Sequence, residues 1–102
     1  MNGGNKYTSS GELIKGNNNW SINHKGDVNN YLTKKGWTVQ QIQETLNDGI
    51  DLGEYGTVLK EGASKGNITY RIHNTILNKS LILDKKTNQI IQLGQEGYKW
   101  IK

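Results

Sequence analysis

The chain has 102 residues, the length of a single domain with a small core. It carries 13 basic and 9 acidic residues, and the resulting net charge of +4 suits a polyanionic partner. Because there is no cysteine, disulfide bonds, cysteine-ligated zinc and a thiol nucleophile are excluded. No apolar run reaches the roughly 18–20 residues of a membrane span. We therefore expect one domain held together by hydrophobic packing.

The first part of the chain is polar. Residues 1–19 are rich in Gly, Asn and Ser, which predicts a flexible lead in which Leu13 and Ile14 form a brief extended piece. Trp20 begins the apolar pattern, so we place a single folded domain at residues 20–102.

A short helix is expected from about Asp27 to Lys35. Three side chains have the i, i+3, i+4 spacing of one helical face, namely Val28, Tyr31 and Leu32. Asp27 suits the N-cap, where a side-chain oxygen accepts from a free backbone N–H. Gly36 suits the position just beyond the helix, where φ is positive and a Cβ would clash.

A second helix is expected to begin directly after this glycine and to run over residues 39–47. Thr38 suits its N-cap, and Gln41 three residues later completes a capping box. Trp37 and Ile42 have the spacing of a hydrophobic staple, which places the indole between the two helices. The buried stripe of this helix is predicted to be Val39, Ile42 and Leu46.

The rest of the chain changes from a helical to a strand period. Residues 49–66 contain five glycines and are interpreted as a loop with a short strand at 57–60. From Ile68 to His73, apolar and polar residues alternate, which places Thr69, Arg71 and His73 on one side of a strand. Further strands are predicted at 80–84, 89–93 and 98–101. Two helices packed on an antiparallel meander of about four strands make an α+β domain.

Charge is distributed unevenly along the chain. Residues 36–54 carry four acidic residues and neither Lys nor Arg, whereas residues 55–102 carry eight basic residues. An anionic ligand is therefore expected at the second half of the chain and at the region of Lys25, Lys34 and Lys35.

Two stretches resemble colicin E-five-like anticodon ribonucleases. Gly-Trp-Thr at 36–38, followed by Ile42, resembles the start of a helix in that family. Leu-Asp-Lys-Lys-Thr at 83–87, followed by Ile-Ile-Gln-Leu at 90–93, is similar to the family's last hairpin. The resemblance covers roughly residues 25–100.

The resemblance implies a metal-independent tRNA endonuclease without cofactor, with the fold of barnase, EndoU, colicin and RelE-type ribonucleases. It implies a toxin domain of a colicin or contact-dependent inhibition protein, secreted or delivered within a larger toxin and active in the cytoplasm of the target bacterium. Its partners would be tRNA and a cognate, acidic immunity protein, with a host translation factor as a further candidate. Lys35 fills the family's arginine position, whereas Asp27 stands where the family has a lysine, with His24 and Lys25 just upstream.

Metal-free RNA cleavage needs a base for the ribose 2′-OH, donors for the charge on the phosphoryl oxygens and an acid for the leaving 5′-oxygen. It yields a 2′,3′-cyclic phosphate and a free 5′-OH. The candidate catalytic residues are Lys25, Lys35, Arg71, His24 and Thr69. The candidate RNA-binding residues are Lys34, Lys60, His73, Lys85, Lys86 and Gln92.

Structural roles are the alternative for each candidate. Lys34 and Lys35 complement the negative end of a helix, and His24 near a helix start is a common surface or capping residue. Arg71 and His73 suit the solvated face of a strand.

Two other functions are the alternatives to a ribonuclease. One is a helix-turn-helix reader at residues 28–47, but its would-be recognition helix lacks Lys and Arg. The other is a non-catalytic protein-interaction domain.

Overall fold

The computed structural model describes residues 5–7, 13–15 and 20–100. Its main part has two helices, α1 (Val28–Lys35) and α2 (Val39–Asp48), and a five-stranded sheet. The strands of this sheet are β3 (Ser21–Ile22), β4 (Ile50–Thr57), β5 (Ile68–Asn74), β6 (Lys79–Asp84) and β7 (Gln89–Leu93). Within the described residues, neither helix is long and apolar enough to cross a membrane.

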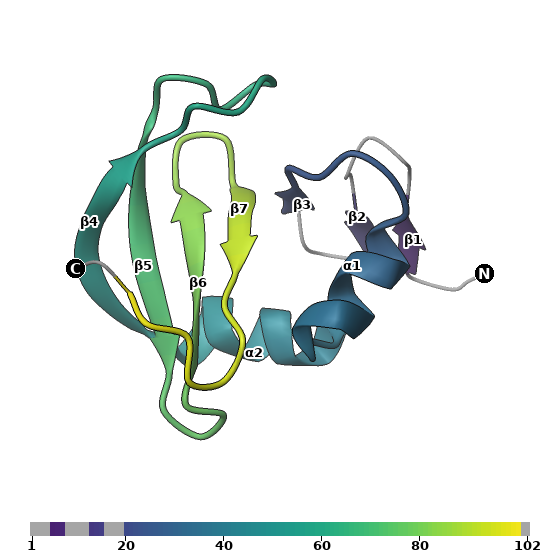
Figure 1. Ribbon diagram of the computed structural model, residues 1–102, viewed down its shortest axis with the longest axis vertical. Helices are drawn as coiled ribbons and strands as arrows, with labels where there is room; N and C mark the ends of the chain where they lie inside the picture. The colour runs from purple at the N-terminus through teal and green to yellow at the C-terminus, as the bar shows by residue number, and fades with distance from the viewer. Residues whose placement is uncertain (1–4, 8–12, 16–19, 101–102) are drawn as a thin grey trace.

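The sheet has the order β3-β7-β6-β5-β4 (Figure 1). Strands β4 to β7 form an antiparallel meander, and β3 adds to β7 in parallel. The α+β class and the predicted strands at 68–73, 80–84 and 89–93 are confirmed, but a purely antiparallel sheet is wrong. The added strand is only two residues long, too short for its pairing direction to show as a sequence period.

The two helices begin and end as predicted. The Asp27 carboxylate accepts from the Asn29 N–H at 2.9 Å, and Gly36 ends α1 with a φ of 74°. The Thr38 hydroxyl accepts from the Gln41 N–H, while the Gln41 side chain accepts from the Thr38 N–H. Capping interactions between neighbouring residues thus set the end of α1 and the start of α2, which together form the corner between the two helices.

The corner is also tied to the sheet. Trp37 is 3 % exposed, and its indole N–H donates to the Gly94 carbonyl at 2.8 Å. Trp37 and Ile42 share one core with apolar side chains of α1 and of strands β3, β5, β6 and β7. In α2 the predicted stripe is only partly confirmed: Thr45 is fully buried, whereas Val39 and Leu46 are half-buried.

The loop predicted at residues 49–66 is wrong over most of its first half, where β4 forms. Its pairing with β5 is irregular, with register shifts on both sides of Glu54, and Gly53 has a φ of 98°. These bulges hid the strand, because they interrupt the alternation that marks a strand in sequence. The short strand predicted at 57–60 is also wrong beyond Thr57.

The strand predicted at 98–101 is absent over residues 98–100, and Ile101 lies outside the described residues. This segment instead crosses the sheet toward β4 (Figure 1). There the Trp100 ring meets Tyr55 edge-on, with centroids 5.4 Å apart, and packs beside Val58, Ile82 and Ile91. Burial of the indole against the open sheet face replaces strand pairing.

In the N-terminal stretch, β1 (Asn5–Tyr7) pairs antiparallel with β2 (Leu13–Lys15). The extended piece expected at Leu13 and Ile14 lies in β2. Residues 5–7 of the predicted flexible lead form β1 instead, and residues 1–4, 8–12 and 16–19 lie outside the described residues. Trp20, at 2 % exposure, starts the core as expected.

Candidate functional site

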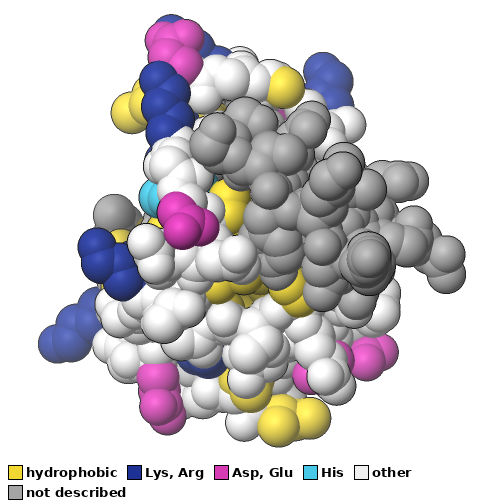
Figure 2. Space-filling model, turned by 90° about the vertical axis from the view of Figure 1, so that its right-hand side faces the viewer, with side chains coloured by type: hydrophobic (Ala, Val, Ile, Leu, Met, Phe, Trp, Pro, Cys, Tyr) yellow, Lys and Arg dark blue, Asp and Glu magenta, His cyan; other side chains and the backbone are white. Residues whose placement is uncertain are grey.

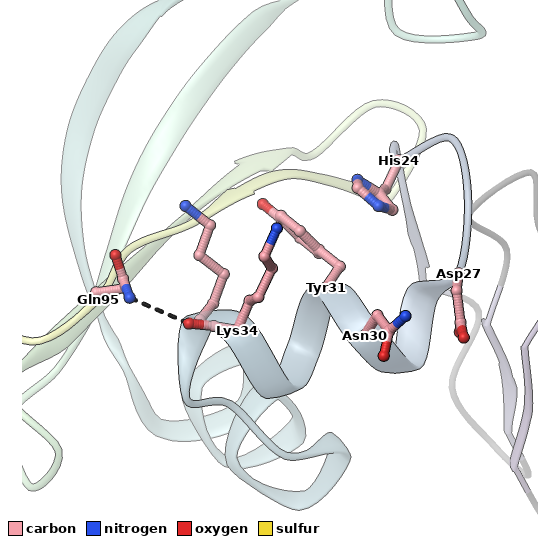
Figure 3. A pocket seen from close by; sticks show the side chains of 7 residues that line it. His24, Asp27, Asn30, Tyr31, Lys34 and Gln95 are labelled. Atoms are coloured by element: carbon pink, nitrogen blue, oxygen red, sulfur yellow. Dashed lines mark hydrogen bonds between the residues drawn. The ribbon is translucent and has the colours of Figure 1, made fainter.

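An open pocket of about 440 Å³ lies along α1 (Figure 3). Its lining comes from α1, from the segment after β3 and from the turn after β7. The lining residues are His24, Asp27, Asn30, Tyr31, Lys34, Lys35 and Gln95.

The short parallel strand positions His24. Between this strand and His24, the Asn23 N–H donates to the Ile90 carbonyl at 2.8 Å. The His24 N–H itself donates to the Ile22 carbonyl at 3.0 Å. The imidazole then stacks on Tyr31, with ring centroids 4.2 Å apart and planes 18° from parallel. Figure 3 shows the two rings on the same side of α1.

Tyr31 is a fixed support for this histidine. Its hydroxyl accepts from the Leu93 N–H at 3.2 Å, and burial raises the pKa of the phenol. The Lys35 ammonium lies 5.8 Å from the centre of the Tyr31 ring. The Gln95 amide donates to the Lys34 carbonyl at 3.1 Å and so holds the turn after β7 against the end of α1.

A second open pocket, of about 410 Å³, is also lined by His24. Asn23, Lys25, Lys60 and Glu61 complete its lining. The Lys60 ammonium donates to the Ile91 carbonyl at 2.9 Å and contacts the Asn23 carbonyl at 3.5 Å. It is therefore anchored beside the histidine.

The charges around these pockets change the acidity of two groups. Burial lowers the pKa of His24 below its ordinary 6.5; Lys60 and Lys34 lower it further, against an opposing effect of Asp27. Burial also lowers the pKa of Lys60, with Lys35 as the second cause. His24 is therefore mainly neutral at pH 7 and able to accept a proton.

Arg71 and His73 lie on β5, away from the residues that line these two pockets. The Arg71 Nε–H donates to the Ser80 hydroxyl at 3.0 Å, and His73 Nδ1 lies 2.7 Å from the same oxygen. The Arg71 guanidinium is 5.0 Å from the centre of the Trp100 ring. Thr69 is 3 % exposed and donates to the Gly56 carbonyl at 2.7 Å, which gives it a structural role.

Lys85 and Lys86 lie at the turn between β6 and β7 and line a third pocket. Lys85 forms an ion pair with Asp51, and its ammonium is 3.9 Å from the centre of the Tyr70 ring. Gln92 is half-buried on β7, opposite Ile82.

The structure thus brings together His24, Lys25, Lys34, Lys35 and Lys60, five of the eleven candidates. Sequence reasoning missed Tyr31 and Gln95 as site residues. Tyr31 has the spacing of the apolar helix face and was assigned to it, and no sequence signal marks Gln95.

Comparisons with models of protein families, with curated proteins and with solved structures found no match. Within the described part of the chain, no group of three His, Cys, Asp or Glu side chains is arranged to hold a metal ion.

Proposed function

We propose that this protein is a ribonuclease toxin domain that cleaves RNA without a metal ion at His24. One observation carries the proposal: the half-buried imidazole of His24 stacks on the Tyr31 ring with lysines nearby. Lys60 and Lys34 lower the pKa of His24, and Lys35 lowers the pKa of Lys60. Lysines attract the phosphates of RNA, and a neutral histidine accepts a proton at neutral pH.

In this mechanism, neutral His24 takes the proton of the ribose 2′-OH. The 2′-oxygen attacks the adjacent phosphorus, and the bond from phosphorus to the 5′-oxygen breaks. The ammonium of Lys35 stabilises the charge on the phosphoryl oxygens. A water molecule supplies the proton that the departing 5′-oxygen takes up.

The finer parts of the proposal rest on the resemblance at residues 36–38 and 83–93. They are the fold type of barnase and RelE, the anticodon loop of tRNA as substrate, delivery within a larger toxin and neutralisation by a cognate immunity protein. An acidic inhibitor suits the lysines around His24, because opposite charges speed association.

The test is incubation of the purified protein with bulk tRNA in EDTA. We expect discrete fragments with 5′-OH and 2′,3′-cyclic phosphate ends, and at least a hundredfold slower single-turnover cleavage by His24→Asn. His73→Asn is the matched control and should cut at a rate close to that of the parent. The absence of fragments with the parent protein would contradict a nuclease function.

A further inference from the structure

The two pockets meet at His24, which lines both. Resting on the proposed function, we propose that they form one groove that binds consecutive phosphates of a single RNA strand, one on each side of the ribose that faces His24. Lys34 and Lys35 would contact the phosphate in the pocket along α1. Lys25 and Lys60 would contact the phosphate in the other pocket.

The positive groups of the two pockets are close enough to act on each other. Lys60 and Lys34, one from each pocket, both affect the charge of His24, and Lys35 affects that of Lys60. Figure 2 shows basic side chains gathered along one edge of the molecule, with a histidine among them. A continuous positive strip attracts a chain of phosphates more strongly than two isolated lysines would.

The acidic residues of the groove are engaged elsewhere. Asp27 accepts from the Asn29 N–H at the start of α1, and Figure 3 places it at the opposite end of the pocket from Gln95. Glu61 forms an ion pair with Lys65 at 2.7 Å. A phosphate that enters either pocket therefore meets ammonium groups that these carboxylates leave uncovered.

The shape favours a single strand over a duplex. Both pockets are open to the surface, so a chain can pass from one to the other across the half-buried imidazole. For in-line attack of the 2′-oxygen on the adjacent phosphorus, the nucleotide must leave the regular helical stack, which holds that oxygen out of line. Unpaired nucleotides do this at little cost, whereas a base-paired helix must be opened first.

The experiment measures binding of a fluorescein-labelled single-stranded DNA hexanucleotide by anisotropy at several salt concentrations. This probe lacks the 2′-OH and cannot be cleaved by the proposed route, so binding is read without catalysis. Each phosphate contact in a single strand contributes about 0.7 to the slope of log affinity against log salt. We expect Lys35→Gln and Lys25→Gln each to lower the slope by about 0.7, and the double variant by about 1.4.

Lys99→Gln is the matched control, because it removes an equal charge from an exposed lysine on the tail. Lys60→Gln gives a second measurement in the pocket of Lys25 and should also lower the slope. The groove is excluded if only the lysines of one pocket change the slope, or if a hexanucleotide duplex binds more tightly than the single strand. Cleavage of tRNA together with either result leaves the nuclease standing and removes only the groove. If the changes in slope are additive but the parent protein does not cleave tRNA, the groove is retained and the nuclease is rejected.

Discussion

His24 gains its proposed role from its neighbours. A histidine near a helix start is ordinarily a surface residue, but here the imidazole stacks on the Tyr31 ring, and burial together with the nearby Lys60 and Lys34 disfavours its charged form. The acid side of the pH–rate profile should therefore lie below 6.5, the ordinary pKa of His24.

Removing one lysine tests this influence. In Lys34→Gln a positive neighbour is lost, the pKa of His24 rises, and the acid limb of the single-turnover pH–rate profile should move to higher pH. Lys99→Gln should leave the limb in place. A limb that stays fixed in Lys34→Gln would show that another group controls the rate.

Asp84 is a buried carboxylate with a structural role. Burial alone would raise its pKa, but hydrogen bonds from Asn67, Ser64 and Thr87 and from the Lys86 backbone N–H lower it from 3.8 to about 2. Because the folded pKa is depressed, the stabilisation is present above pH 3.8 and is lost as the pH falls toward about 2. It is on the order of 2 kcal/mol.

The corresponding variant is Asp84→Asn. It should lower the free energy of unfolding at pH 7 by about 2 kcal/mol and flatten the decline in stability below pH 3.8, as followed by urea denaturation. Glu96→Gln, at an exposed carboxylate, should change neither quantity. An unchanged acid dependence in Asp84→Asn would show that other carboxylates cause it.

The candidate site could be predicted from sequence only where a residue type carries its own chemistry. His24 and the lysines were identifiable by charge and pKa. The supporting role of Tyr31 was not, because its aromatic ring on the apolar face of a helix suits a core residue equally well. Arg71 and His73 were assigned by alternation, which gives the side of a strand but not the distance to α1.

At the scale of elements, the corner between α1 and α2 connects the helices to the turn after β7. Trp37→Ala should lower the free energy of unfolding by roughly 3–5 kcal/mol, because it removes a buried indole. Trp37→Phe should cost about 1–3 kcal/mol, since the Gly94 carbonyl then loses its donor. Urea denaturation measures both.

An exposed aromatic residue provides the comparison. Tyr98 is 43 % exposed, and Tyr98→Ala should cost much less than Trp37→Ala. Equal stability of Trp37→Ala and the parent protein would mean that the indole does not support the corner.

The elements that could be predicted are those set by neighbouring residues. Thr38, Gln41 and Gly36 determine the helix ends through contacts within a few positions. Strand β4 and the tail depend on distant partners instead: β4 is recognisable only beside β5, and Trp100 leaves a strand-like sequence to bury its ring. Contacts between residues far apart in the sequence leave no hydrophobic period within the segment itself, so the sequence does not reveal them.

At the scale of the whole molecule, charge is segregated. The acidic residues of 36–54 lie on α2 and β4, whereas the lysines of the two pockets surround α1 and the segment after β3. Such a charge distribution would turn the basic side toward the proposed RNA substrate before contact. The acidic α2 surface also argues against its use as a recognition helix in a DNA groove.

The parallel pairing of β3 with β7 also constrains how the protein is made. Residues 21–22 leave the ribosome before their hydrogen-bonding partners at residues 88–90 have been synthesised. Until then Ile22 has no sheet to join, and the Ile91 carbonyl that accepts from Lys60 is not yet beside His24. Long-range pairing of this kind forms late in folding, because the intervening chain must first be closed into a loop. A chain in which residues 88–90 have not yet been synthesised therefore lacks an assembled site, and the proposed nuclease activity would arise only after that point.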